Sequence, residues 1–344
     1  MKQNDILYMK RCFDLAVLGR GSVSPNPMVG AVIVHNDRII GEGFHMKYGS
    51  AHAEVNAVNS VLAIDKHLLP ESTIYINLEP CCIHGNTPPC TDLIIKHKIP
   101  RVVFSCVDQT SGVRGKSIKI LEGAGCKVTT GIEKNTGKTL IRERTVFATL
   151  PRPYIILKYA QSADGFIGKN NKSIWLTNPV SKRLVHKWRS EVDAIIVGTK
   201  TAAIDNPHLT NRLFFGKSPL RIVLDRKLEL ARHLNLFDQN QLTWVVTQKT
   251  APSDELNLLY KSIPFNDFLL PEILRLLHLQ KNSSLIVEGG KKLLDSFIHL
   301  GLWDEARVFE SPSLLYEGLR APILQQKPQR EFKIEQDKLM VFYK

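Results

Sequence analysis

The sequence has no long hydrophobic run, no apolar N-terminal segment and no internal repeat. Among its 344 residues no stretch of eighteen is apolar, so we expect no membrane-spanning helix. The first five residues, MKQND, lack the apolar core of a secretion signal. Hydrophobic residues make up 43% of the chain, which is enough to bury cores of ordinary size. We therefore expect a cytoplasmic globular protein with no membrane partner and, at this length, two domains.

Acidic residues are scarce relative to basic ones. The chain has 33 Asp and Glu against 46 Lys and Arg, which gives a formal charge of +13. A basic surface suits nucleic acid, but it suits anionic small molecules equally well. The Lys and Arg residues are scattered rather than gathered in blocks, so the charge by itself does not choose between these partners.

Cysteine is also sparse, with six residues, but three of the six lie close together at Cys81, Cys82 and Cys90. In a cytoplasmic chain of this size, clustered cysteines indicate a metal site more than disulfides. His52 and Glu54 precede them in a His-Ala-Glu motif. One His nitrogen and two thiolates are zinc ligands, and three protein ligands leave a fourth position for water. The pattern predicts a Zn²⁺ ion on His52, Cys81 and Cys90.

The chemistry of such a site assigns a role to the glutamate. Zinc lowers the pKa of a bound water, and a glutamate that is not a ligand carries the proton to a departing amine in zinc base deaminases. We expect Glu54 to be this catalytic residue. Cys82 adjoins a ligand, but Cys81 follows Pro80 directly and is preferred as the ligand. We expect His52 and Cys90 to begin helices, whose positive ends favour a thiolate.

The hydrophobic pattern predicts α/β structure in both halves. The expected strands of the first half are 29–34, 38–42, 73–77 and 101–106, and its expected helices are 6–18, 52–62 and one from Pro89. Residues 147–153 contain two prolines and are interpreted as a linker between domains at 1–146 and 154–344. Strands and helices alternate again in the second half, which predicts a mostly parallel sheet. That half has no G-x-G-x-x-G after an early strand, so a standard dinucleotide-binding domain is not expected.

Motifs along the whole chain resemble those of one known family. In the first half they are SPNPMVG (24–30), GEGFH (41–45), His-Ala-Glu, and a cysteine pair separated by eight residues that end in TPP. In the second half they are KYAQSADG (158–165), SIWLT (173–177), GTKTAAIDNPHLTNR (198–212) and EGG (288–290). The set resembles the bifunctional deaminase/reductase family of riboflavin biosynthesis.

This resemblance implies a cytidine-deaminase-like three-layer domain followed by a dihydrofolate-reductase-like domain, with Zn²⁺ and NADPH as cofactors. It implies hydrolytic deamination of a phosphorylated small molecule, 2,5-diamino-6-(5-phosphoribosylamino)pyrimidin-4(3H)-one, and then reduction of its ribosyl group to ribityl. The residues it places against substrate are Asn26, His45, Lys158, Ser173, Arg189, Leu209, Arg212 and Glu288. Those it places against NADPH are Trp175, Thr201, Asp205, Gly290, Lys291 and Lys292. We also expect a homo-oligomer.

The chain departs from the family pattern around the deaminase motif. The family has His at position 83 and a basic residue at position 86, where this chain has Ile83 and Asn86. The family's DPNP after the next strand is DQTS here, at 108–111. A reductase with a degenerate or retargeted deaminase domain is therefore a second hypothesis. An RNA-binding or base-editing protein is a third, but the cysteine spacing and the motifs of the second half count against it.

Overall fold

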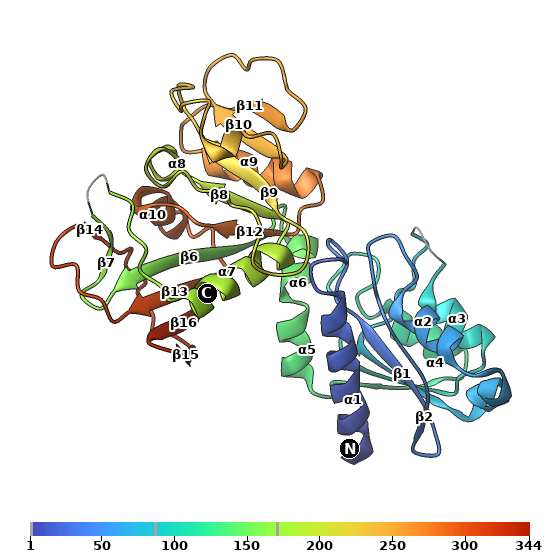
Figure 1. The fold of residues 1–344 in the computed structure, drawn as a ribbon. Coiled ribbons are helices and arrows are strands. Elements are labelled where there is room, and N and C mark those ends of the chain that lie inside the picture. The colour runs from blue at the N-terminus through green and yellow to red at the C-terminus, as the bar shows by residue number, and fades with distance from the viewer. Residues whose placement is uncertain (1–2, 86–87, 170–171) are drawn as a thin grey trace. The chain divides into compact units, whose positions relative to one another are not determined.

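The computed structural model describes residues 3–85, 88–169 and 172–344. The chain divides into two compact units, the first of residues 1–151 and the second of residues 152–344 (Figure 1). None of the described helices combines the length and the apolarity that a membrane span requires.

The first unit is built on a five-stranded sheet. Its strands are β1 (Gly30–His35), β2 (Arg38–Phe44), β3 (Thr73–Leu78), β4 (Arg101–Cys106) and β5 (Lys127–Thr130), in the order β2-β1-β3-β4-β5. β1 runs antiparallel to both neighbours, and β3, β4 and β5 run parallel. Its helices are α1 (Gln3–Ala16), η1 (Val17–Gly19), α2 (Ala53–Ser60), η2 (Ala63–Glu71), α3 (Cys90–Lys96), α4 (Lys116–Gly123), α5 (Lys134–Leu140) and α6 (Arg142–Thr149).

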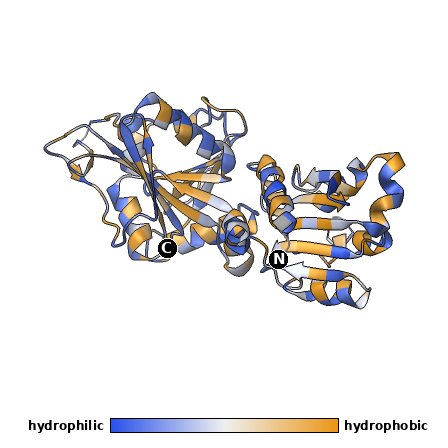
Figure 2. Ribbon diagram, turned by 90° about the horizontal axis from the view of Figure 1, so that it is seen from below, coloured by the Kyte–Doolittle hydropathy of each residue, from blue (hydrophilic) through white to orange (hydrophobic). Residues whose placement is uncertain are grey.

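Alternation along the strands covers both faces of this sheet. Val32 and Tyr75 lie in a buried cluster with Met9 of α1, whereas Ile33 and Ile74 lie in another with residues of α2 and α3. Successive strand side chains point to opposite faces, so helices pack on both sides and form three layers. In Figure 1 α2, α3 and α4 lie together on one side of the sheet and α1 on the other. Figure 2 shows that the helices carry hydrophobic and hydrophilic residues in alternation, as helices that cover a core do.

The second unit is built on a nine-stranded sheet in the order β11-β10-β9-β8-β12-β6-β13-β16-β15. The strands are β6 (Tyr154–Ser162), β8 (Ala194–Val197), β9 (Leu220–Leu224), β10 (Thr243–Thr247), β11 (Leu258–Ser262), β12 (Ser284–Val287), β13 (Glu305–Ser311), β15 (Arg330–Ile334) and β16 (Asp337–Tyr343). Along the sheet, the seven strands β11, β10, β9, β8, β12, β6 and β13 pair in parallel, each with the next. β16 pairs antiparallel with β13 and β15. A separate pair joins β7 (Phe166–Gly168) to β14 (Leu319–Arg320).

Helices also cover both faces of the second sheet. They are α7 (Pro179–Glu191), α8 (Thr199–Asp205), α9 (Leu269–Leu279), α10 (Lys291–His299) and the short η3 (Asn235–Phe237). Leu274 of α9 and Phe297 of α10 lie in one buried cluster with Leu285 of β12. Trp188 of α7 packs on the opposite face against Phe309, with ring centroids 5.5 Å apart. The predicted α/β fold class is confirmed, as is the mostly parallel second sheet; its antiparallel edge was not predicted.

The segment expected as a linker, residues 147–153, overlaps the end of α6 and contains the boundary between the two compact units. α6 continues to Thr149, so the first three residues of this segment are helical. Leu150 has extended backbone angles and directly precedes Pro151, and a residue before proline disfavours the helical region. The last helical residue, Thr149, therefore lies two residues before Pro151. No helix was expected here from the sequence.

Arg221 of β9 is completely buried and organises the turn around residues 235–243. Its guanidinium donates to Thr243 Oγ1 and Asp238 Oδ1, and to the carbonyls of His208, Asn235, Leu236 and Gln241. Removing the cation leaves a carboxylate and several carbonyls without their donor, which costs about 3–5 kcal/mol for a buried pair. We expect Arg221→Met to lower the free energy of unfolding of the second unit by this amount.

Urea unfolding followed by tryptophan fluorescence measures this effect, since all four tryptophans lie in the second unit. Arg226→Met is the control, because Arg226 makes an exposed bond to Gln248 and its loss should cost under about 0.5 kcal/mol. Equal destabilisation by the two substitutions would contradict the role assigned to Arg221.

Candidate active sites

Three predicted ligands converge at one point of the first unit. His52 Nδ1 lies 3.5 Å from Cys81 Sγ and 3.3 Å from Cys90 Sγ, and the three donor atoms all lie within 4.8 Å of one another. Tetrahedral zinc with bonds of ordinary length separates its N and S ligands by about 3.5 Å. The donor set and its spacing therefore fit a zinc ion, with Nδ1 as the histidine ligand.

Local structure explains why these residues meet. His52 is the residue before α2 and has extended backbone angles, and Cys90 is the first residue of α3. Cys81 follows β3, and its Sγ accepts a hydrogen bond from the Cys90 backbone N–H at 3.3 Å. The neighbouring Cys82 Sγ instead faces the carbonyl of Gly112 at 3.8 Å, outside the donor cluster. The geometry agrees with the preference for Cys81.

The two thiols differ in acidity. A hydrogen bond from Cys90 lowers the pKa of Cys81 to about 4, against the opposing effect of burial, and His52 adds to the decrease. The same bond to Cys81, together with burial, raises the pKa of Cys90. Cys81 is therefore the first of the pair to become a thiolate, which is the form that binds metal.

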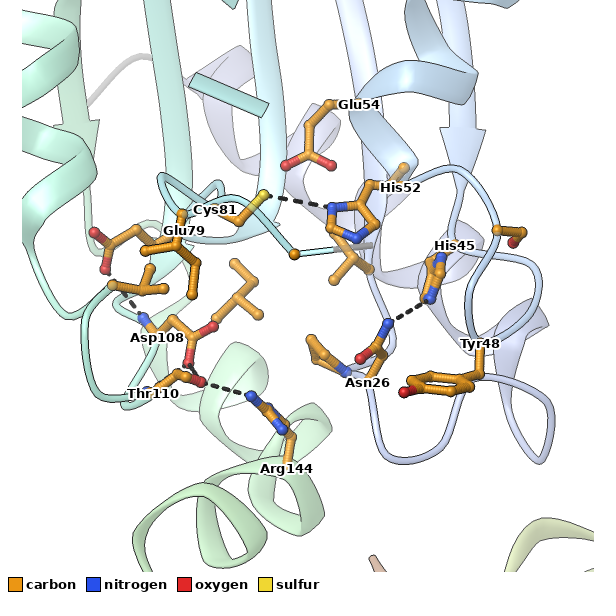
Figure 3. Close-up of a pocket in the computed structure, with 18 of the residues that line it drawn as sticks. Asn26, His45, Tyr48, His52, Glu54, Glu79, Cys81, Asp108, Thr110 and Arg144 are labelled. Atoms are coloured by element: carbon orange, nitrogen blue, oxygen red, sulfur yellow. Dashed lines mark hydrogen bonds between the residues drawn. The ribbon is translucent and has the colours of Figure 1, made fainter. Parts of the chain in front are cut away.

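A pocket of about 310 Å³ opens beside the three ligands. Glu54, in the first turn of α2, lines it and is only 3% exposed. Burial raises the pKa of the Glu54 carboxyl, and the charge of Cys81 adds to this effect. Figure 3 shows Glu54 at the His52–Cys81 end of the pocket, with His45 beside His52 and Asn26 next to His45. The Glu54 carboxyl therefore lies next to the three predicted zinc ligands and lines the pocket.

Asn26 and His45 form one hydrogen-bonded unit. His45 Nδ1 lies 3.0 Å from the Ala51 carbonyl, which can only accept, so Nδ1 carries the proton. His45 Nε2 then accepts from the Asn26 amide nitrogen at 3.1 Å. His45 is 2% exposed, and burial lowers its pKa, which favours this neutral state. The amide oxygen of Asn26 is left to accept a hydrogen bond from a ligand.

Two charged pocket residues, Glu79 and Arg144, are among those that had no predicted role. Glu79 is buried and accepts hydrogen bonds from the backbone N–H groups of Asp108, Gly115 and Ser117, so it fixes the loop after β4. It belongs to the LEPC sequence that contains Cys81, which was the available signal. Arg144 of α6 also lines the pocket, and it had no signal because α6 itself was not expected. Ile83 lines the pocket as well, whereas Asn86 lies outside the described residues.

In the second unit the structure brings together three of the predicted substrate residues. Arg189 of α7 forms a two-pronged ion pair with Glu288, at 3.0 and 2.9 Å. Lys158 of β6 lies 3.6 Å from the same carboxylate. Burial alone would raise the pKa of Glu288, but the charges of Arg189 and Lys158 outweigh it and hold the pKa at about 2. The Arg212 backbone N–H donates to the buried His186 at 2.9 Å, which joins Arg212 to α7.

Of the residues predicted to contact NADPH, Thr201 and Gly290 are hydrogen-bonded to each other, whereas the side chains of Asp205, Lys291 and Lys292 make no hydrogen bond or ion pair with these two in the part of the chain that the structure describes. Thr201 of α8 accepts a hydrogen bond from the Gly290 N–H at 2.9 Å, and Gly290 directly precedes α10. A side chain at Gly290 would approach Thr201 Oγ1 to 3.0 Å, so this junction suits glycine. Lys291 pairs with Asp295 within α10 at 2.8 Å. Asp205, at the end of α8, and Lys292 are exposed.

Three other predicted residues, Trp175, Ser173 and Leu209, have no described bond to the group of Arg189, Glu288 and Lys158. Trp175 is 66% exposed, and its described contacts are with Thr177 in its own loop and with Lys182 of α7. Ser173 is exposed in the same loop. Leu209 is buried as a whole residue, and its backbone has a φ of 55°.

Comparison with protein families finds a match in each unit. The family described as RibD C-terminal domain matches residues 153–342. The family described as cytidine and deoxycytidylate deaminase zinc-binding region matches residues 2–106, which include His52, Cys81 and Cys90. The predicted cofactors, Zn²⁺ and NADPH, are confirmed by these matches together with the donor cluster.

Relatives match over nearly the whole chain. The riboflavin biosynthesis protein RibD of Aquifex aeolicus is 36% identical over 93% of this chain and 90% of its own length. That of Escherichia coli is 33% identical over 92% of this chain and 90% of its own. The crystal structure of a deaminase/reductase from Thermotoga maritima has a TM-score of 0.89 and 33% identity, over 99% of this chain and 98% of that one. The chain thus belongs to the family of bifunctional riboflavin-biosynthesis enzymes, which join a zinc-binding deaminase domain to an NADPH-dependent reductase domain.

Proposed function

We propose that residues 1–146 replace an amino group of 2,5-diamino-6-(5-phosphoribosylamino)pyrimidin-4(3H)-one by oxygen, and that residues 154–344 reduce the ribosyl group of the product to ribityl. The observation that carries this proposal is the group of His52, Cys81 and Cys90, with Glu54 buried beside it in a pocket. The Thermotoga relative is described as a diaminohydroxyphosphoribosylaminopyrimidine deaminase and 5-amino-6-(5-phosphoribosylamino)uracil reductase, which supports the choice of substrate.

In the deaminase half, His52, Cys81 and Cys90 would hold a zinc ion that activates water for attack on the amine-bearing carbon. Glu54 would carry a proton to the departing amine, so that water and the amine become a carbonyl group and ammonia. The Asn26 oxygen would accept a hydrogen bond from the pyrimidine, because its amide nitrogen is already bound to His45. These residues orient the ring with its amine toward Glu54.

In the reductase half, bound NADPH supplies the hydride, and the protein positions the sugar. Glu288, held ionised by Arg189 and Lys158, would accept hydrogen bonds from ribose hydroxyls. Lys158 is largely buried, which lowers its pKa, and it could give a proton to the ring oxygen as the ribose opens. Arg212 would bind the phosphate, and the Thr201–Gly290 junction at the start of α10 would face NADPH. Ser173, Leu209, Trp175, Asp205, Lys291 and Lys292 stay predictions in the roles given above.

The two half-reactions are tested separately by following ammonia release and NADPH oxidation with purified protein. We expect ammonia from the diaminopyrimidinone without NADPH, and NADPH oxidation on the deaminated product. NADPH oxidation without any ammonia would favour the second hypothesis, a reductase with a degenerate or retargeted deaminase domain. A cytoplasmic location and a homo-oligomeric state also stay predictions.

Arg189 makes the reductase half dependent on pH in a defined direction. Its charge lowers the pKa of Glu288 and that of His186, which burial and neighbouring charges hold at about 4. In Arg189→Met both values rise, so the acid limb of kcat/KM for NADPH oxidation should move to higher pH. The measurement is a pH profile on the deaminated substrate. Arg183→Met, at an exposed position of α7, is the control, and an acid limb that stays in place in Arg189→Met would contradict the assignment.

A further inference from the structure

The charge of the deaminase pocket is uneven. Glu54, Glu79 and Asp108 line it, and Arg144 is the one Lys or Arg among the described residues that do so. The segment between the two cysteine ligands, residues 82–89, contains no Lys or Arg in its sequence either. A phosphorylated ligand that enters this pocket therefore meets a single fixed positive charge.

The Arg144 guanidinium has neutral partners and an unused donor. Nη2 donates to Thr110 Oγ1 at 2.9 Å, and Nη1 donates to the Pro25 carbonyl at 3.4 Å. Nε is buried and has no hydrogen-bond partner among the described residues. Burial lowers the pKa of Arg144, and the charge of Asp108 opposes this effect without outweighing it. A largely desolvated cation without a paired carboxylate is costly, and an anionic ligand removes that cost.

The surroundings of Arg144 hold it in place. Thr110, which accepts from Arg144, donates its own hydroxyl to Asp108 Oδ1 at 2.6 Å. Glu79 in turn fixes the Asp108 backbone. This chain of contacts orients the guanidinium toward the pocket rather than toward solvent, as Figure 3 shows.

Position along the pocket fits the shape of the substrate. In Figure 3 Arg144 lies at the end away from Glu54, His52 and Cys81. The reacting carbon must lie beside Glu54, and the phosphate is at the far end of the ribose that the pyrimidine carries. A planar guanidinium at the far end can bind two phosphate oxygens.

We propose that Arg144 of α6 binds the phosphate of the deaminase substrate and so selects phosphorylated over unphosphorylated pyrimidines. This inference rests on the proposed deaminase function, but it concerns a residue that this function does not assign. Arg144 acts in binding and orientation and does not touch the reacting atoms.

The test compares ammonia release from the phosphorylated substrate and from its unphosphorylated riboside. Arg144→Gln should lower kcat/KM for the phosphorylated substrate about 100-fold or more, the usual effect of removing one partner of a desolvated charge pair. Its kcat/KM for the riboside should stay within about threefold of wild type, and its zinc content should not change. Lys138→Gln, an exposed position on α5, is the matched control. An equal loss on both substrates would overturn the proposal, because a purely structural role predicts that result.

A binding measurement keeps this inference separate from the deaminase function. Equilibrium dialysis with ribose 5-phosphate is done in an Arg212→Gln background, which removes the phosphate residue proposed for the reductase half. Adding Arg144→Gln should weaken the remaining binding at least about tenfold. If wild type releases no ammonia but this loss of binding appears, the deaminase proposal fails and the role of Arg144 stands. If Arg144→Gln leaves binding unchanged, the role of Arg144 is overturned whatever the activity.

Discussion

Glu54→Gln should reduce ammonia release by about 10³-fold or more while the protein keeps its zinc. Glutamine preserves the size of the side chain and its fit in the pocket, but it cannot carry a proton. General acid–base groups contribute about 10²- to 10⁴-fold, and a carboxyl that both takes and gives a proton belongs at the upper end of this range. Glu54 is buried beside the ligands and is not one of them, so the metal should stay.

Three measurements on the same protein check this expectation: ammonia release, zinc content by atomic absorption, and NADPH oxidation on the deaminated substrate. The last should be unchanged, since Glu54 belongs to the first unit. Glu122→Gln, at an exposed position of α4, controls for the loss of one negative charge. Ammonia release within tenfold of wild type in Glu54→Gln would remove Glu54 from the catalytic role.

Cys81→Ser should lose zinc, whereas Cys82→Ser should keep it. Cys81 Sγ and Cys90 Sγ both face His52 Nδ1, while Cys82 Sγ faces the Gly112 carbonyl. Loss of groups that merely support metal ligands weakens binding by about 10- to 100-fold, so loss of a ligand should exceed this range. Ammonia release should disappear with the metal in Cys81→Ser and persist in Cys82→Ser.

The adjacent cysteine makes this comparison a matched one, since each substitution removes one thiol and the two positions are neighbours in the sequence. Metal content per protein is measured after dialysis against a limiting concentration of chelator. Equal zinc content in the two variants would mean that either thiol can serve, and the assignment of Cys81 would be wrong.

The zinc site was predictable because its chemistry is local in sequence. The motifs contain the ligands His52, Cys81 and Cys90, and the helix starts predicted at His52 and Cys90 lie within one residue of the observed ones. The strand at 101–106 was predicted with its observed bounds because it is a continuous buried run between a proline and a polar loop.

The pocket residues that could not be predicted depend on contacts between segments that are distant in the sequence. Arg144 enters the pocket from α6, and its partners Pro25 and Thr110 lie more than thirty residues away in sequence. Glu79 was visible in a motif, but its bonds to the loop at 108–117 exist only in three dimensions. Leu209 was predicted from a motif, and its burial depends on three-dimensional packing that a pattern of residue types does not show.

Hydrolytic deamination in the pocket beside His52, Cys81 and Cys90 can be measured by the fate of the water oxygen. The most direct measurement supplies zinc-loaded protein with the phosphorylated diaminopyrimidinone in ¹⁸O-labelled water, without NADPH. We expect ammonia and product in equal amounts, with one ¹⁸O atom in each product molecule. A protein that binds zinc and reduces the deaminated substrate with NADPH, yet releases no ammonia and incorporates no label, would contradict this expectation.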